Sequence, residues 1–127
     1  MIYLCNGISN SMLRDPNTKQ IPLSLTEAEF TQLILNTNFT SAIGHESLAE
    51  CLTKLVGIPI HRNRRNLIIN YDDYVILVSL NGRLPEHPTH VEYKNRLNFS
   101  FVRFEKQSTE DLLTSQMKIN EIIKMEE

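Results

Sequence analysis

The segment DYVILVSL, at residues 73–80, constrains the fold more than any other part of the chain. Every side chain from Val75 to Val78 is apolar, and three of these four residues are β-branched. A short run of this kind, followed by the Gly- and Pro-containing loop at 81–87, predicts a β-strand. Because neither face of this strand offers polar side chains to water, we expect a central strand that is covered on both faces.

Further segments are predicted to be strands of the same sheet: residues 1–5, 20–25, 66–70 and 97–101. The second of these carries Pro22, which cannot donate a backbone hydrogen bond and therefore favours the edge of the sheet. The third is expected to form a hairpin with residues 73–80 through a turn at 71–73. The sequence thus predicts about five strands.

The predicted helices are recognised by capping residues at their ends. Segment 26–36 begins with a capping box, in which Thr26 and Glu29 bond each other's backbone amides. A second helix is expected from about residue 44 to 56, with Gly57 as its C-cap. Residues 91–96 are ambiguous and could form a short helix.

The tail at 108–125 has a capped, amphipathic helical pattern, and we expect it to pack against the core or a partner subunit. Together these elements predict an α+β fold: a mixed sheet of about five strands flanked by helices, with a C-terminal amphipathic helix.

Composition narrows the classes of function. A chain of 127 residues suits a single domain, 1–127. Its net charge of −2 argues against a protein that tracks a long nucleic acid. The run HRNRR at 61–65 is locally basic, which suggests either a site for a small anionic ligand or a solvated loop. We expect Cys5 and Cys51 to be reduced core thiols.

Neither a basic, apolar leader nor an apolar run of membrane-spanning length is seen, so we expect a soluble, cytoplasmic protein with no membrane contact.

Three segments could converge at one end of the sheet: the loop after residues 1–5, the start of the second helix, and the loop after 73–80. His45 is expected on the first turn of that helix, where an imidazole can act as acid or base near neutral pH. Arg83 and Glu86, three residues apart, could grip a phosphate and orient a neighbouring group. A local ion pair between these two side chains is the alternative.

A metal site is expected to be absent. Glu86, His87 and His90 could be drawn as ligands, but their loop spacing has no helical register to fix it. No phosphate-binding loop, dinucleotide fingerprint or nucleophile elbow is present in the sequence. We therefore expect no metal and no cofactor.

Four motifs give the chain a resemblance to a known family: IYLCNGISNSML at the start, SAIGHES, GIPIHRNR, and GRLPEH after the apolar strand. In their order and spacing they resemble the viral ring nucleases, anti-CRISPR proteins of archaeal viruses and bacteriophages that act against type III systems. The resemblance covers roughly residues 1–105 and leaves 106–127 as a C-terminal helical extension. It implies that the chain binds and cleaves cyclic tetraadenylate, as a homodimer and without a metal.

The resemblance also implies roles for individual residues. The histidine of the AIGH motif, here His45, is the catalytic residue, and Glu86 assists it. The substrate-binding residues would be Arg83, Arg64, Asn6, Ser9, Ser11 and Ser47.

The chain departs from the family at Pro85 and His87, which could reshape the loop around Glu86. Two other functions stay open: a sponge that binds a cyclic nucleotide without cutting it, and a protein-interaction module that uses the tail helix. In the second, His45 would only cap a helix.

Overall fold

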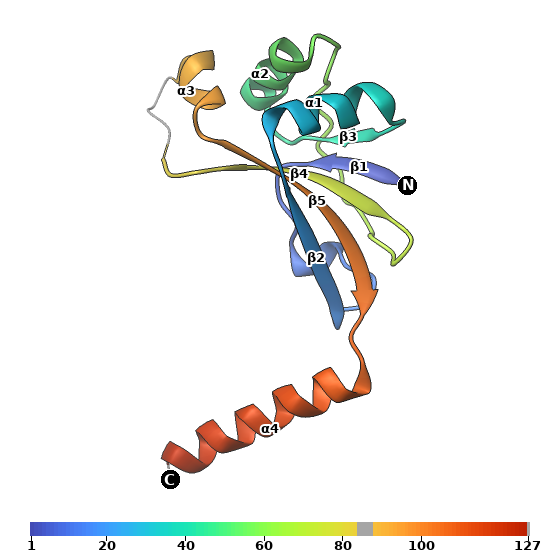
Figure 1. Ribbon diagram of the computed structural model, residues 1–127, viewed down its shortest axis with the longest axis vertical. Helices are drawn as coiled ribbons and strands as arrows, with labels where there is room; N and C mark the ends of the chain where they lie inside the picture. The colour runs from blue at the N-terminus through green and yellow to red at the C-terminus, as the bar shows by residue number, and fades with distance from the viewer. Residues whose placement is uncertain (84–87, 127) are drawn as a thin grey trace.

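The computed structural model describes residues 1–83 and 88–126, and this part of the chain forms one five-stranded mixed sheet (Figure 1). The strand order is β2-β5-β4-β1-β3. Strands β1, β3 and β4 run parallel, whereas β5 is antiparallel to β4 and to β2. The strand bounds are β1 (Ile2–Cys5), β2 (Thr18–Leu25), β3 (Thr40–Ala42), β4 (Tyr74–Leu80) and β5 (Leu97–Lys106).

The helices in the described residues are η1 (Asn10–Met12), α1 (Glu27–Asn36), α2 (Glu46–Val56), α3 (His90–Lys94) and α4 (Thr109–Glu126). The capping box of α1 is confirmed: Glu29 N donates to Thr26 Oγ1 at 3.1 Å, and Thr26 N donates to Glu29 Oε1 at 3.0 Å. Gly57 closes α2 with φ of 81°, a conformation that favours glycine. The α+β fold predicted from the sequence is confirmed.

Both faces of the sheet are covered, as the apolar strand requires. On one face, Ile76 and Val78 of β4 pack in a core with α1 and α2. On the other face, Val75 packs in a second cluster with Leu13 and with Leu67 of the segment before β4. The prediction of a central strand is therefore confirmed for β4, and β2, which carries Pro22, lies at the edge of the sheet as expected.

The predicted strand at 66–70 is wrong, and so is its hairpin with β4. Leu67 and Ile69 are buried and Ile68 is 54% exposed, which is the alternation of a strand. However, this segment lies over the second face of the sheet, held by one bridge between Leu13 and Ile69. Ile69 N donates to Met12 O at 2.7 Å, so its partner is the end of η1 and the residues just after it rather than a strand of the sheet.

The fifth strand of the sheet is β3, which the sequence analysis did not predict. It is three residues long and pairs with β1 through Tyr3 and Thr40, Leu4 and Ser41, and Cys5 and Ala42. A segment this short, with two hydroxyl residues, carries too little alternation to be recognised from the sequence.

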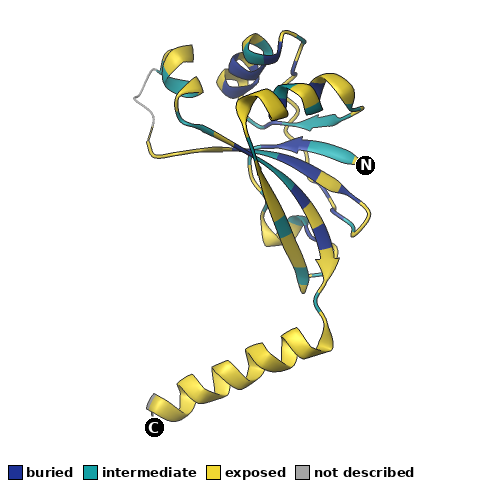
Figure 2. Ribbon diagram, viewed as in Figure 1, coloured by how far each residue is buried: buried dark blue, intermediate teal, exposed yellow. Residues whose placement is uncertain are grey.

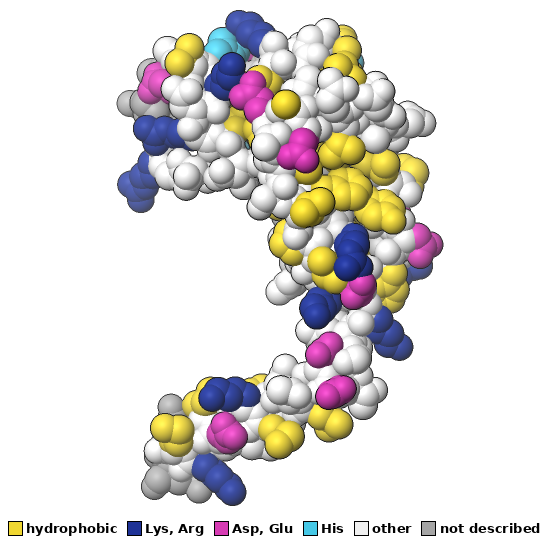
Figure 3. Space-filling view, viewed as in Figure 1, with side chains coloured by type: hydrophobic (Ala, Val, Ile, Leu, Met, Phe, Trp, Pro, Cys, Tyr) yellow, Lys and Arg dark blue, Asp and Glu magenta, His cyan; other side chains and the backbone are white. Residues whose placement is uncertain are grey.

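Helix α4 does not pack against the core of its own chain. The expectation that the tail packs against the core is therefore wrong, and packing against a partner subunit stays a prediction. It extends away from the sheet, and its described side chains are exposed on all sides (Figures 1 and 2). Hydrophobic side chains are visible along it in Figure 3, with Leu113 59% and Met117 65% exposed. Among residues 1–83 and 88–126, no helix is long and apolar enough to cross a membrane.

Candidate functional site

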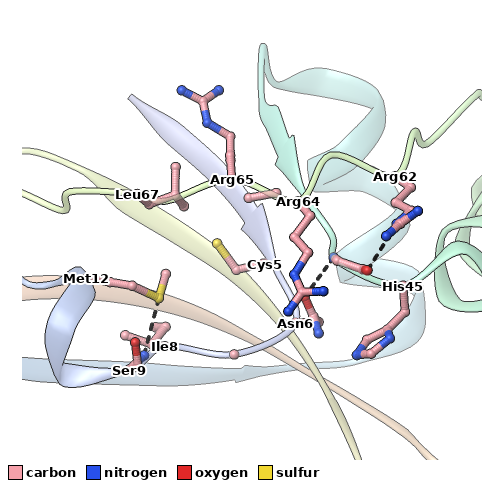
Figure 4. A pocket seen from close by; sticks show the side chains of 13 residues that line it. Cys5, Asn6, Ile8, Ser9, Met12, His45, Arg62, Arg64, Arg65 and Leu67 are labelled. Carbon is pink, nitrogen blue, oxygen red and sulfur yellow. Dashed lines mark hydrogen bonds between the residues drawn. The ribbon is translucent and has the colours of Figure 1, made fainter.

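The carboxyl ends of the three parallel strands lie at one edge of the sheet, where ligands of such sheets usually bind. A cleft of about 560 Å³ opens at this edge, between the loop after β1, the β3–α2 junction and the loop at 61–67. Its described lining residues are Cys5, Asn6, Gly7, Ile8, Ser9, Met12, Ala42, Gly44, His45, Arg62, Arg64, Arg65 and Leu67. Figure 4 shows this cleft from close by.

Gly44 is fixed from both sides. Its amide N donates to Asn6 Oδ1 at 3.1 Å, and its carbonyl O accepts from Arg62 Nε at 3.2 Å. Both bonds are drawn in Figure 4. They join three segments that are far apart in the sequence, and they set the direction in which the chain enters α2.

His45 is the N-cap residue of α2, one position before the first turn on which we expected it. Its backbone is extended, with φ of −120° and ψ of 126°, and its carbonyl O accepts the bond from Ala49 N. The imidazole makes no capping hydrogen bond and is exposed, so the alternative of a capping histidine is not supported. The ring therefore lines the cleft and can reach a ligand in it.

The loop at 61–65 is held against β3 by hydrogen bonds. Ser41 Oγ donates to His61 O at 2.7 Å, and Asn63 Nδ2 donates to Ser41 O at 2.7 Å. Asn63 N donates to Ile43 O at 2.8 Å. These bonds fix the course of the loop and direct the arginines on either side of Asn63 to the cleft.

The cleft is positively charged. Arg62, Arg64 and Arg65 all line it, and its described lining includes no Asp or Glu. In Figure 4 the guanidinium of Arg64 extends toward Asn6, whereas Arg65 points away from that group. Since the arginines are uncompensated by any lining carboxylate, the cleft favours an anion. Three arginines of the basic run thus line a cleft, and the binding of an anionic ligand there stays a prediction.

The structure brings together half of the predicted site residues: Asn6, Ser9, His45 and Arg64 line the cleft. Ser11 does not line it, but its Oγ lies 2.9 Å from Ser9 Oγ. Ser47 is exposed on the first turn of α2, outside the described lining. Arg62 and Arg65 also line the cleft, and neither was predicted as an individual site residue, although both belong to the basic run HRNRR.

The loop after β4 is described only in part. Arg83 is exposed and does not line the cleft. Glu86 and its neighbours Pro85 and His87 lie outside the described residues. The alternative of an ion pair between Arg83 and Glu86 therefore stays a prediction. In the part of the chain that is described, no group of three or more His, Cys, Asp or Glu side chains could hold a metal ion.

A second, smaller pocket of about 270 Å³ shares Asn6 and His45 with the cleft. Its other described lining residues are Leu48, Val78, Ser79, Leu80 and Tyr93. This pocket was not predicted from the sequence, because its residues come from α2, β4 and α3 and share no local pattern.

The fold and the site define a small α+β protein with a basic cleft at the carboxyl edge of its parallel strands. The sequence profile of the STIV B116-like family matches residues 2–101, and the chain belongs to this family. Helix α4 lies beyond the matched residues.

Two viral proteins are similar in sequence. Uncharacterized protein 26 of Sulfolobus islandicus filamentous virus (isolate Iceland/Hveragerdi) is 36% identical over 86 residues, which cover 68% of this chain and 73% of that protein. Uncharacterized protein ORF117 of Acidianus two-tailed virus is 36% identical over 89 residues, which cover 68% of this chain and 74% of that protein.

The fold is similar to the solved structure of B116 of Sulfolobus turreted icosahedral virus, with a TM-score of 0.67 and 24% identity. This similarity covers 80% of the present chain and 97% of B116.

Proposed function

We propose that the protein is a ring nuclease that binds and cleaves cyclic tetraadenylate and thereby suppresses type III CRISPR defence. The observation that carries the proposal is the cleft that His45 lines together with three arginines and with no carboxylate among its described lining residues. The resemblance of the SAIGHES and HRNRR segments to the viral ring nucleases and the membership of a family with viral relatives agree with it.

The reaction needs no nucleophile from the protein. In RNA the 2′-hydroxyl next to each phosphate can attack phosphorus. As the new 2′-O–P bond forms, the P–O5′ bond breaks, and the products are a 2′,3′-cyclic phosphate and a 5′-hydroxyl. The 2′-hydroxyl loses its proton to water, and His45 donates a proton to the leaving 5′-oxygen.

Charge on the phosphate would be stabilised by Arg64, whose guanidinium extends toward Asn6 and the side of the cleft on which His45 lies. Arg83 and Glu86 belong to the loop after β4. Leu80, at the end of β4, lines the smaller pocket together with His45. Arg83 follows three residues later, and a chain of that length reaches about 10 Å. In the proposal Arg83 adds a charged contact to the phosphate, and Glu86 has the assisting role that the resemblance implies.

Cyclic tetraadenylate has two-fold symmetry, and a C₂ dimer presents the same cleft twice. The active form in this proposal is therefore a homodimer with the ligand across its axis. Light scattering in the presence of the ligand is expected to give the mass of two chains.

The test compares cleavage and binding of cyclic tetraadenylate in EDTA, with products separated by chromatography. We expect the parent protein to release linear adenylates that end in a cyclic phosphate. His45→Ala should bind nearly as well and cut about 10²–10⁴-fold more slowly, the usual contribution of a general acid. Arg64→Ala should also bind the ring more weakly, because it removes a charged contact to the phosphate.

The matched control is Arg14→Ala, because Arg14 is exposed and lies outside the described lining of the cleft. It should bind and cut like the parent. A parent that binds the ring without cutting it would be a sponge, and a His45→Ala variant that cuts at the parent rate would exclude His45 as the acid.

A further inference from the structure

The smaller pocket differs in chemistry from the cleft that it adjoins. Leu48 and Val78 form its buried wall, at 3% and 1% exposure. Leu80 and Tyr93 add apolar and aromatic surface, and none of the described lining residues is an Arg, Lys, Asp or Glu. A basic cleft and an apolar pocket therefore meet at the side chains of Asn6 and His45.

We propose that this pocket is a base subsite, which receives an adenine ring of the nucleotide whose phosphate lies in the basic cleft. This inference rests on the proposed function, because it names the part of the ligand that the pocket takes. A nucleotide carries an anion and a planar apolar ring on one sugar, and these two parts match the two hollows on either side of His45.

Size and shape agree with a single ring system. Pockets for drug-sized ligands usually measure about 300–1,000 Å³, and this one, at about 270 Å³, lies just below that range. Tyr93 supplies an aromatic surface for stacking, which is the usual way in which proteins hold single-stranded bases.

The position of Tyr93 is set by the helix that carries it. Thr89 and Glu92 form a capping box at the start of α3, with Glu92 N donating to Thr89 Oγ1 at 3.2 Å. Tyr93 N donates to Thr89 O at 3.1 Å, and Tyr93 packs against the core under α2. The ring is therefore positioned before a ligand arrives, so that little conformational freedom is lost on binding.

The experiment separates the base from the phosphate. Adenosine 5′-monophosphate and ribose 5-phosphate are titrated into the protein and followed by NMR, so that cleavage plays no part in the measurement. We expect adenosine 5′-monophosphate to bind at least about tenfold more tightly, in line with typical base stacking. Tyr93→Ala should abolish this difference, whereas Tyr93→Phe, which keeps the ring, should preserve it.

Two further variants test whether Tyr93→Ala acts through the pocket or by disturbing the fold. Val91→Ala changes the same helix at a 66% exposed side chain outside the described lining of this pocket, and it should behave like the parent. Leu80→Trp fills the pocket from a 42% exposed position and should lower only the affinity for adenosine 5′-monophosphate.

The outcomes distinguish this inference from the proposed function. Equal or undetectable binding of the two probes by the parent overturns the base subsite even if the ring is cut. The base subsite is also overturned if Tyr93→Ala and Leu80→Trp lose affinity for both probes to the same degree. If the probes differ as expected but cyclic tetraadenylate is not cleaved, the base subsite stands and the nuclease proposal falls.

Discussion

Cys5 shows how two side chains of one cleft can differ in reactivity. Its side chain lines the cleft with His45, yet the residue is only 1% exposed, and burial raises the pKa of its thiol to about 11. A pKa this high means that on the order of one thiol in 10⁴ is ionised at pH 7. Since the thiolate is the nucleophile, Cys5 is chemically inert while the protein is folded.

We predict that iodoacetamide leaves Cys5 unmodified at neutral pH in the native protein. Peptide mass spectrometry after a timed reaction measures this, with urea-denatured protein as the control in which Cys5 reacts. The rate should rise as the pH approaches 11, because the thiolate then becomes populated. Rapid labelling of the native protein at pH 7 would contradict the assignment of Cys5 as a core thiol.

At the scale of elements, the connection from α2 to the arginine loop depends on Thr53. Its Oγ1 accepts from Ile60 N at 2.8 Å and donates to Ala49 O at 2.8 Å. Ile60 is buried, so its amide has no access to water if the hydroxyl is removed. This bond fixes the turn from which residues 61–65 run to the cleft.

We predict that Thr53→Val lowers the free energy of unfolding by about 1–3 kcal/mol, the usual cost of an unsatisfied buried donor. Urea denaturation measures the change. Thr37→Val is the matched control, because Thr37 Oγ1 only donates to Leu33 O and its loss leaves no amide without an acceptor. Similar losses in the two variants would show that the bond to Ile60 contributes nothing specific.

At the scale of the whole molecule, the burial of side chains changes abruptly at the short connection between β5 and α4. Val102 and Phe104 of β5 are 2% and 4% exposed and belong to the second core cluster. The side chains of α4, by contrast, are exposed wherever they are described. The family match ends at residue 101, before this connection.

We therefore predict that a chain ending after residue 107 keeps its free energy of unfolding within about 0.5 kcal/mol. A chain ending after residue 101 should lose several kcal/mol or fail to fold, because it lacks two buried side chains of β5. Thermal unfolding followed by circular dichroism at low protein concentration compares the two. A large loss of stability in the chain that ends after residue 107 would mean that α4 packs on the core in solution.

The sequence by itself determined the features that depend on neighbouring residues. The capping box at Thr26, the glycine C-cap at Gly57 and the apolar run of β4 are local signals, and each was found where it was predicted. The same holds for Pro22, since a residue without an amide hydrogen favours an edge strand wherever it occurs.

Only the tertiary structure decided which segments meet. The alternation of Leu67, Ile68 and Ile69 predicts a buried and an exposed side, but it does not say which surface covers the buried one. Likewise, the hydroxyl-rich β3 owes its place to pairing with β1 rather than to its own composition. The apolar pocket beside His45 is formed by α2, β4 and α3 together, and contacts between residues so far apart leave no pattern in the sequence.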